Sequence, residues 1–332
     1  MRGDKVILFW SKYDPAIDTG IGAWQSREIS YNPSATLTLQ THLRFGHDVT
    51  LYTYQPIPQG IPSEVNLRDA SDIYPATDAW DALTQGHEIA HISDLVRLRA
   101  AAQTNGLVAD MDSLIVNELP DLDGFFCTIP AKASGGVARK WGKSNPPFLV
   151  HDGSWDGKAL SNFPTKVGKS MQQPILDLAD EIQRRLTIAP KKNKYDGNGK
   201  GSVLMSTDWN FVMHALKDIS HDLPDTKVLP PIKAGPLPGW LPPRKCFSIE
   251  SPTRLTGEHL SFGYRVPSIQ EILDNSFLVQ HYFESAAQKV VQTERHASFW
   301  YDIPADSLIG VIAKQTVGDK WRTLLPSLAT TS

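Results

Sequence analysis

The chain has 332 residues, enough for one large domain or two ordinary ones, and its 41% hydrophobic and 21% charged residues suit a globular protein with a sizeable core. A net charge of -3 at pH 7, without a long block of Lys or Arg, argues against extensive non-specific binding of nucleic acid. Cys127 and Cys246 lie far apart in the sequence and favour reduced thiols over a disulfide scaffold. No stretch approaches the roughly 20 apolar residues of a membrane span, so we expect a cytoplasmic protein with at most peripheral membrane contact.

The N-terminal part predicts a strand-helix-strand unit. Residues 5–10, "KVILFW", form a continuous apolar run, which is typical of a strand covered on both faces. Residues 34–48, "SATLTLQTHLRFGHD", indicate a helix with Gly46 placed just past its end. Residues 49–56, "VTLYTYQP", alternate as a second strand does and end at Pro56. Such a unit normally pairs its two strands in parallel.

The same order returns between residues 89 and 109. Apolar residues recur at helical spacing at Ile89, Ile92, Leu95, Val96 and Leu98. Asn105 and Gly106 are expected to end this helix, and residues 107–109 to form the next strand. Further strands are predicted at 123–129, 147–152 and 202–207, and an amphipathic helix at 173–186 has Pro174 in its first turn.

Residues 222–243 contain seven prolines, too many for a helix or a central strand. Two interpretations stay open for this segment: a surface connector, or a loop that lines a binding cleft. Beyond it, residues 268–273, "SIQEIL", have a helical pattern.

Asp110 and Asp112 follow the strand predicted at residues 107–109. In open α/β sheets ligands bind beyond the carboxyl ends of strands. If both aspartates continue the strand, they point to one side and Met111 to the other. Two carboxylates on one side repel each other unless a cation lies between them, and their oxygens suit Mg²⁺ or Mn²⁺ with open positions for phosphates. The alternative is a turn in which both aspartates are merely solvated.

Asp94 and Arg97 are three residues apart on the preceding helix, so they are neighbours on one face. A solvated ion pair is one explanation for this spacing. The other is that the helix folds back directly into the strand and presents both side chains toward the rim that carries Asp110 and Asp112.

Residues 93–116, "SDLVRLRAAAQTNGLVADMDSLIV", resemble the S-D-x-x-R, helix, G-G-x-Y-x-D-x-D segment of glycosyltransferases with the DXD sugar-binding region. This family includes retaining mannosyl- and galactosyltransferases and, more distantly, glucosylating bacterial toxins. Residues 5–10, residues 45–56, "FGHDVTLYTYQP", and residues 276–285, "SFLVQHYFES", resemble further family segments in the same order. The sequence departs from the pattern at Asn105, Val108 and Tyr282, where Gly, an aromatic residue and Trp are usual.

The resemblance implies an α/β fold of GT-A type, a nucleotide-binding mixed sheet flanked by helices. It implies one GT-A-like domain over residues 1–332, with a nucleotide-sugar-binding half at 1–120 and an acceptor-side half at 121–332 that includes the proline-rich loop. The implied reaction transfers a hexose from a UDP- or GDP-hexose donor to a glycan or other hydroxyl acceptor, with retention and with Mn²⁺ or Mg²⁺. No partner among nucleic acids is expected.

The resemblance also assigns roles to individual residues. Asp112 would ligate the metal directly, and Asp110 would touch the ribose or reach the metal through water. Asp94 would accept hydrogen bonds from sugar hydroxyls, and Arg97 would hold the sugar or a phosphate oxygen. Phe9 or Trp10 would pack against the base, although a core position is the alternative for either.

Weaker candidates lie in the C-terminal half. His281 is a candidate third metal ligand, ahead of His259 and His296, and a structural role is the alternative. Trp300 would cover the donor as a lid or belong to the core, and Asp208 would meet the acceptor.

Two other functions fit parts of the sequence. A phosphatase of the haloacid-dehalogenase type also has Asp-x-Asp after an apolar strand, the first Asp attacking phosphorus. That motif normally opens its domain, whereas about a hundred residues precede Asp110 here, and Asp94 and Arg97 would have no role. The third candidate is a non-catalytic protein that binds nucleotide sugars or glycans. The presence of all four polar residues, Asp94, Arg97, Asp110 and Asp112, argues against it.

Overall fold

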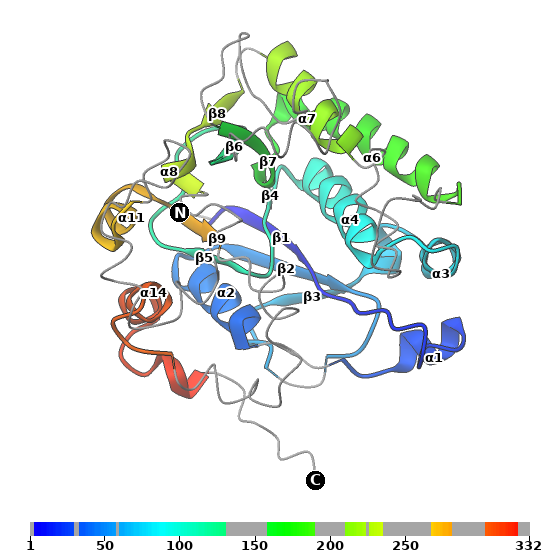
Figure 1. The fold of residues 1–332 in the computed structure, drawn as a ribbon, viewed down its shortest axis with the longest axis horizontal. Helices are drawn as coiled ribbons and strands as arrows, with labels where there is room; N and C mark the ends of the chain where they lie inside the picture. Colours follow the sequence, from blue (N-terminus) through cyan, green and yellow to red (C-terminus); the bar gives the residue numbers. More distant parts are fainter. Residues whose placement is uncertain are drawn as a thin grey trace, which may run out of the picture.

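The structure is a computed structural model that describes residues 3–29, 33–57, 60–130, 158–189, 210–223, 226–234, 267–280 and 303–324. At its centre lies a seven-stranded mixed sheet with the order β3-β2-β1-β4-β7-β6-β8 (Figure 1). The strands are β1 (Lys5–Phe9), β2 (Asp48–Thr53), β3 (Asn66–Asp69), β4 (Leu107–Val108), β6 (Phe125–Pro130), β7 (Lys158–Lys166) and β8 (Lys227–Leu229). A second sheet pairs β5 (Ser113–Ile115) with β9 (Leu278–Gln280). The expected class, an α/β fold with a mixed sheet flanked by helices, is confirmed.

Six of the seven strands of the large sheet run in the same direction, so their carboxyl ends lie at one edge. β1 pairs in parallel with β2 and with β4, and β2 pairs in parallel with β3. β7 runs antiparallel to both β4 and β6, while β6 and β8 are parallel. The predicted parallel pairing of the first two strands is therefore confirmed, and the sheet is parallel on the side where β4 ends.

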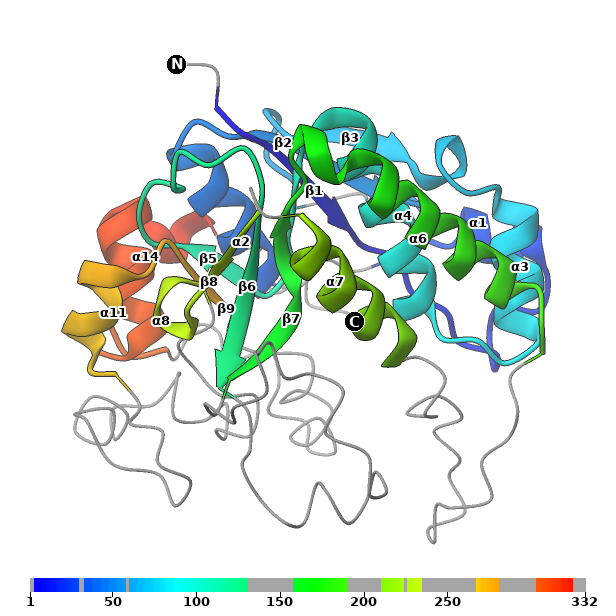
Figure 2. The same cartoon turned by 90° about the horizontal axis from the view of Figure 1, so that it is seen from above.

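Helices cover both faces of the sheet (Figure 2). One face carries α4 (Ile89–Thr104), with α6 (Gln172–Leu186) and α7 (Asn210–Asp222) beyond it, and the other carries α2 (Pro33–Arg44). The remaining helices of the described residues are α1 (Ile21–Ser26), α3 (Ala76–Thr84), α8 (Pro231–Ala234), α11 (Ile269–Asn275) and α14 (Leu308–Val317). Short 3₁₀ turns are η1 (Ala70–Asp72), η2 (Lys169–Met171) and η3 (Trp321–Leu324).

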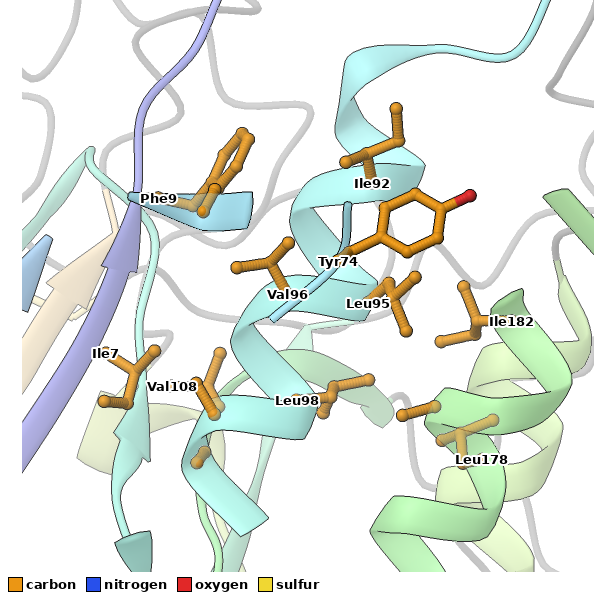
Figure 3. Packing of buried hydrophobic residues seen from close by; sticks show 14 of the residues in the cluster. Ile7, Phe9, Tyr74, Ile92, Leu95, Val96, Leu98, Val108, Leu178 and Ile182 are labelled. Atoms are coloured by element: carbon orange, nitrogen blue, oxygen red, sulfur yellow. The ribbon is translucent and has the colours of Figure 1, made fainter. Parts of the chain in front are cut away.

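The continuous apolar run of β1 is explained by burial on both faces. Ile7 and Phe9 belong to the core cluster beneath α4, whereas Val6 and Leu8 belong to the cluster on the α2 side. Figure 3 shows Ile7 and Phe9 on the side of the sheet that faces α4. Alternate residues of a strand point to opposite faces, so a strand buried twice has apolar residues throughout.

A third core cluster joins the C-terminal elements to the small sheet. Leu37 of α2 and Leu114 of β5 are fully buried there, together with Ile272 of α11 and Ile312 of α14. β5 is the strand that follows the two aspartates, and its packing against α2, α11 and α14 fixes its position.

The proline-rich segment differs from its prediction. Within the described residues it contains β8 and the one-turn helix α8, so the expectation that it excludes a helix was wrong. Pro231 is the first residue of α8. The backbone N–H at this position has no hydrogen-bond partner within a helix, so proline is tolerated there. β8 lies at the edge of the sheet, as expected for a strand beside prolines.

Several sequence predictions lie outside the described residues, namely the strands at 147–152 and 202–207 and the thiol of Cys246. Cys127 is a buried free thiol. Among the described residues, none of the helices combines the length and the apolar character that crossing a membrane requires.

Candidate functional site

The candidate site lies where the chain connections diverge at the sheet edge. From β1 the chain continues to β2 and β3 on one side, and β4 then adds to the other side of β1. At such a switch point the carboxyl ends of the two neighbouring strands leave a crevice between their connections, which is where α/β proteins bind ligands. Trp10 is the first residue after β1, and Asp110 is the second residue after β4.

Arg97 joins three of the groups that the sequence analysis singled out. Its Nη1 donates to Asp110 Oδ1 over 2.5 Å and to the carbonyl oxygen of Ala109 over 2.9 Å. Its Nη2 donates to Asp94 Oδ1 over 3.2 Å, and its Nε donates to the carbonyl oxygen of Ser93 over 3.3 Å. The side chains of Arg97 and Asp94 are only 7% and 9% exposed, and that of Asp110 is 28% exposed. Asp94, Arg97 and Asp110 therefore form one buried ionic cluster.

The local sequence explains why α4 and β4 bring these residues together. Asn105 takes the left-handed conformation, with φ of 53°, and the N–H of Gly106 donates to the carbonyl oxygen of Ala101 over 3.0 Å. Asn tolerates this conformation better than most residues, so the helix ends and the chain reverses within two residues. A Cβ at Gly106 would lie 3.0 Å from Ile7 Cγ1, which shows how closely the turn approaches β1.

Asp112 does not continue the strand. The N–H of Ser113 donates to the carbonyl oxygen of Asp110 over 3.2 Å, so residues 110–113 form a turn with Asp112 partly exposed inside it. The premise that both aspartates follow strand alternation was therefore wrong. The chain turns here because β5 leaves the large sheet to pair with β9, and Thr38 Oγ1 of α2 holds the turn by donating to the carbonyl oxygen of Met111 over 2.9 Å.

Sequence reasoning missed Gln280. It is the last residue of β9, lies opposite Ser113 in the β5-β9 pairing, and is 8% exposed. Its Nε2 donates to Asp110 Oδ2 over 2.7 Å. The two carboxylate oxygens of Asp110 thus accept from different donors, Arg97 on one side and Gln280 on the other. No local motif marks Gln280, because only the pairing of two distant segments brings it here.

Three aspartates and one arginine belong to this part of the chain. Arg97 pairs with Asp94 and Asp110, and Asp112 lies two residues beyond Asp110 in the sequence. The described residues contain no group of three or more His, Cys, Asp or Glu side chains placed to hold a metal. Asp112 still fits Mg²⁺ or Mn²⁺, since such ions are commonly held by one or two carboxylates and take their remaining ligands from phosphates and water. Asp110 fits an outer position, because its oxygens already accept from Arg97 and Gln280.

The aromatic candidates differ in their accessibility. Phe9 is 7% exposed, and its ring meets that of Tyr54 edge to face with centroids 6.0 Å apart. Trp10 is partly exposed, packs against the core cluster on the α2 side, and has Lys12 Nζ 5.5 Å from its ring centroid. The core alternative therefore holds for Phe9. His281 and Trp300 lie outside the described residues, as do Asp208, His259 and His296.

The chain also has an H-E-x-x-H sequence at residues 87–91, which the sequence analysis did not single out. His91 lies in the first turn of α4, whereas His87 precedes the helix and its Nε2 bonds the carbonyl oxygen of Ile188 over 3.0 Å. Burial, and then the neighbouring His87, lower the pKa of His91 to about 3. Zinc motifs of this spacing need both histidines on one helix face. Here His87 instead connects the segment before α4 to Ile188, which follows α6.

No family model matches the chain, and no curated protein matches it. Among solved structures, one described as "PaToxG Glycosyltransferase" aligns with 67% of this chain and 70% of its own, with 14% sequence identity and a TM-score of 0.34. The chain is thus weakly similar to a glycosyltransferase.

Proposed function

We propose that the protein is a metal-dependent glycosyltransferase that moves a hexose from a nucleotide-sugar donor to a glycan or other hydroxyl acceptor. One observation carries the proposal: Arg97 binds Asp94 and Asp110 together at the carboxyl end of β4. Asp94 and Arg97 of the segment that resembles S-D-x-x-R thus meet Asp110 of the D-x-D segment, at the sheet edge where ligands bind in α/β proteins.

The proposed roles follow from the chemistry of each group. Asp112 ligates Mn²⁺ or Mg²⁺, and His281 is proposed as a further ligand on the sequence alone. Asp110 binds the ribose or a metal-bound water, and Asp94 accepts hydrogen bonds from sugar hydroxyls. The ion, when bound, neutralises charge on the leaving nucleoside diphosphate. Trp10 is the proposed contact for the base and Trp300 for a cover over the donor.

Arg97 also has a structural role beside the proposed contact with the sugar or a phosphate oxygen. It donates hydrogen bonds to two carboxylates and to two backbone carbonyl oxygens, so it orients Asp94 and Asp110 relative to each other. A guanidinium suits this task because its donors are fixed in one plane.

We propose retention of configuration, with the leaving phosphate helping to take the acceptor proton, since this route needs no dedicated base. The assignment of donor binding to residues 1–120 and of acceptor binding to 121–332 is part of the same proposal. A phosphatase with Asp110 as its nucleophile fits less well, because Arg97 and Gln280 already bind both oxygens of that carboxylate.

A panel of UDP- and GDP-hexoses, with and without Mn²⁺, tests the proposal. We expect one donor to raise the melting temperature with Mn²⁺ present, because ligand binding stabilises the folded state by mass action. The same donor should release its nucleoside diphosphate slowly in Mn²⁺ and not in EDTA. Donor binding without hydrolysis or transfer to any offered acceptor would identify a non-catalytic binder. Rapid phosphate release from a phosphomonoester in Mg²⁺ would identify a phosphatase.

A further inference from the structure

The carboxylate of Asp110 accepts hydrogen bonds from two donors that belong to different elements of the fold. Arg97 comes from α4 and bonds Oδ1, while Gln280 comes from β9 and bonds Oδ2 over 2.7 Å. Two donors on two oxygens fix the plane of the carboxylate, whereas a single donor leaves it free to rotate. The side chain nevertheless remains 28% exposed, so its outer edge can still be reached by a ligand.

The chemistry at residue 280 is specific. An ionised carboxylate only accepts hydrogen bonds, so the amide of Gln280 must present its NH₂ group to Asp110. The amide is neutral, so it supplies a donor without changing the charge beside Asp110. A Lys or Arg at this position would supply a donor but would add a second positive charge to the one that Arg97 already brings to Asp110.

We infer that Gln280 is a positioning residue that aligns the Asp110 carboxylate for its ligand. This inference rests on the proposed function for the identity of that ligand, but the alignment itself is a property of the folded chain. Gln280 reaches the site through the register of the small sheet, where Ser113 of β5 lies opposite it. The Asp-x-Asp turn thus depends on β9 as well as on the strand that precedes it.

A stability cycle tests the contact without any assay of activity. Gln280→Glu places a second carboxylate against Asp110, and two carboxylates that share a site repel each other. We expect a lower melting temperature than wild type at pH 7.5. When Gln280→Glu is made in the Asp110→Asn background, its loss, measured against Asp110→Asn alone, should be much smaller, because the repelling carboxylate is gone.

Gln270→Glu is the matched control, because Gln270 Nε2 donates to Asp274 Oδ1 over the same 2.7 Å on an exposed surface of α11. A loss for Gln280→Glu no larger than for Gln270→Glu would overturn the inference. A loss that persists in full beside Asp110→Asn would overturn it as well.

Kinetics then test positioning for the reaction. With the donor found in the panel, Gln280→Leu should lower kcat about 10- to 100-fold at every pH, with a smaller change in KM, as is common for partners that orient a ligating group. Gln280→Glu should also lower kcat, because it replaces the donor to Asp110 with a second carboxylate. An unchanged kcat in Gln280→Leu would overturn the role in the reaction. Absence of donor turnover in the wild type would instead refute the proposed function, while the stability cycle would still decide whether Gln280 aligns Asp110.

Discussion

Arg97 and Asp110 form an ion pair of 2.5 Å between a helix and the residues that follow the adjacent strand. Because the Arg97 side chain is only 7% exposed, its removal leaves Asp94 and Asp110 without their shared cation in a largely buried setting. We expect Arg97→Met to lower the free energy of unfolding by about 3 kcal/mol or more, measured by urea denaturation. Arg184→Met removes an exposed pair with Glu181 and should lower it far less. Equal losses in the two variants would contradict the buried role of Arg97.

Asp112 lies in the turn between β4 and β5 and is partly exposed, so its replacement should spare the fold. We expect Asp112→Asn to lose metal-dependent donor turnover by at least about 100-fold and to keep the wild-type melting temperature. Isothermal titration with Mn²⁺ and the donor should show the same loss in binding. Glu118→Gln changes an exposed carboxylate nearby in the sequence and should retain turnover. Wild-type activity in Asp112→Asn would refute the assigned metal ligand.

Thr38 ties α2 to the Asp-x-Asp turn through its hydrogen bond to the carbonyl oxygen of Met111. Thr38→Val keeps the shape of the side chain but leaves a buried carbonyl without this donor, so we expect a loss of about 1 to 3 kcal/mol in the free energy of unfolding. Thr36 is the control, since its buried Oγ1 has no hydrogen-bond partner among the residues that the structure describes. Thr36→Val should be neutral or stabilising, and a larger loss there than at Thr38 would contradict this account.

Buried histidines should make the protein sensitive to acid. Burial holds the pKa of His42 well below its usual range, and it lowers the pKa of His91 to about 3. A histidine with a depressed folded-state pKa contributes stability that is complete above the unfolded pKa of about 6.5 and is lost as pH falls toward the folded value. Each such residue should therefore remove about 1.4 kcal/mol from the free energy of unfolding per pH unit below about 6.5.

The variant His91→Gln tests this dependence. Urea denaturation at several pH values between 7 and 5 should show that the free energy of unfolding falls less steeply with decreasing pH in the variant than in wild type. The difference in slope should correspond to about one proton. Replacing the exposed His221 with Gln should leave the slope unchanged. A wild-type slope in His91→Gln would show that this histidine does not resist protonation in the folded state.

Asn105 has a positive φ of 53°, and this conformation lets the chain reverse direction between α4 and β4. Asn105→Ala should lower the free energy of unfolding by about 1 kcal/mol, because Ala resists the left-handed conformation. Asn105→Gly should match or exceed wild-type stability, since Gly takes this conformation readily. Thermal denaturation of the pair checks the prediction, and an Ala variant as stable as the Gly variant would contradict it.

The sequence predicted the parts of the fold that depend on local signals. The periodic helix at Ile89–Thr104, the stop at Asn105 and the parallel strands follow from patterns that neighbouring residues set. Because α4 folds straight back into β4, the meeting of Asp94, Arg97 and Asp110 could also be anticipated. The likeness of these residues to a known family segment agrees with that placement but leaves their chemical roles as predictions.

The remaining features depend on contacts between distant segments. Strand alternation through Asp112 and a turn were both open from the sequence, and the chain turns there because α2 holds Met111 and β9 pairs with β5. Gln280 reaches Asp110 across 170 residues of sequence, and no periodicity or spacing reports such a contact. The short helix at Pro231 is another difference, because the proline-rich composition predicted no helix in this segment.

Because β5 pairs with β9, this part of the molecule can be completed only after the ribosome has synthesised β9. Asp110 is synthesised 170 residues before Gln280, a delay of roughly 10 to 30 seconds at ordinary rates of translation. During that interval the nascent chain can hold its carboxylate from the α4 side alone. A chain released or cleaved before β9 emerges would keep the whole family-like segment and still lack the finished site.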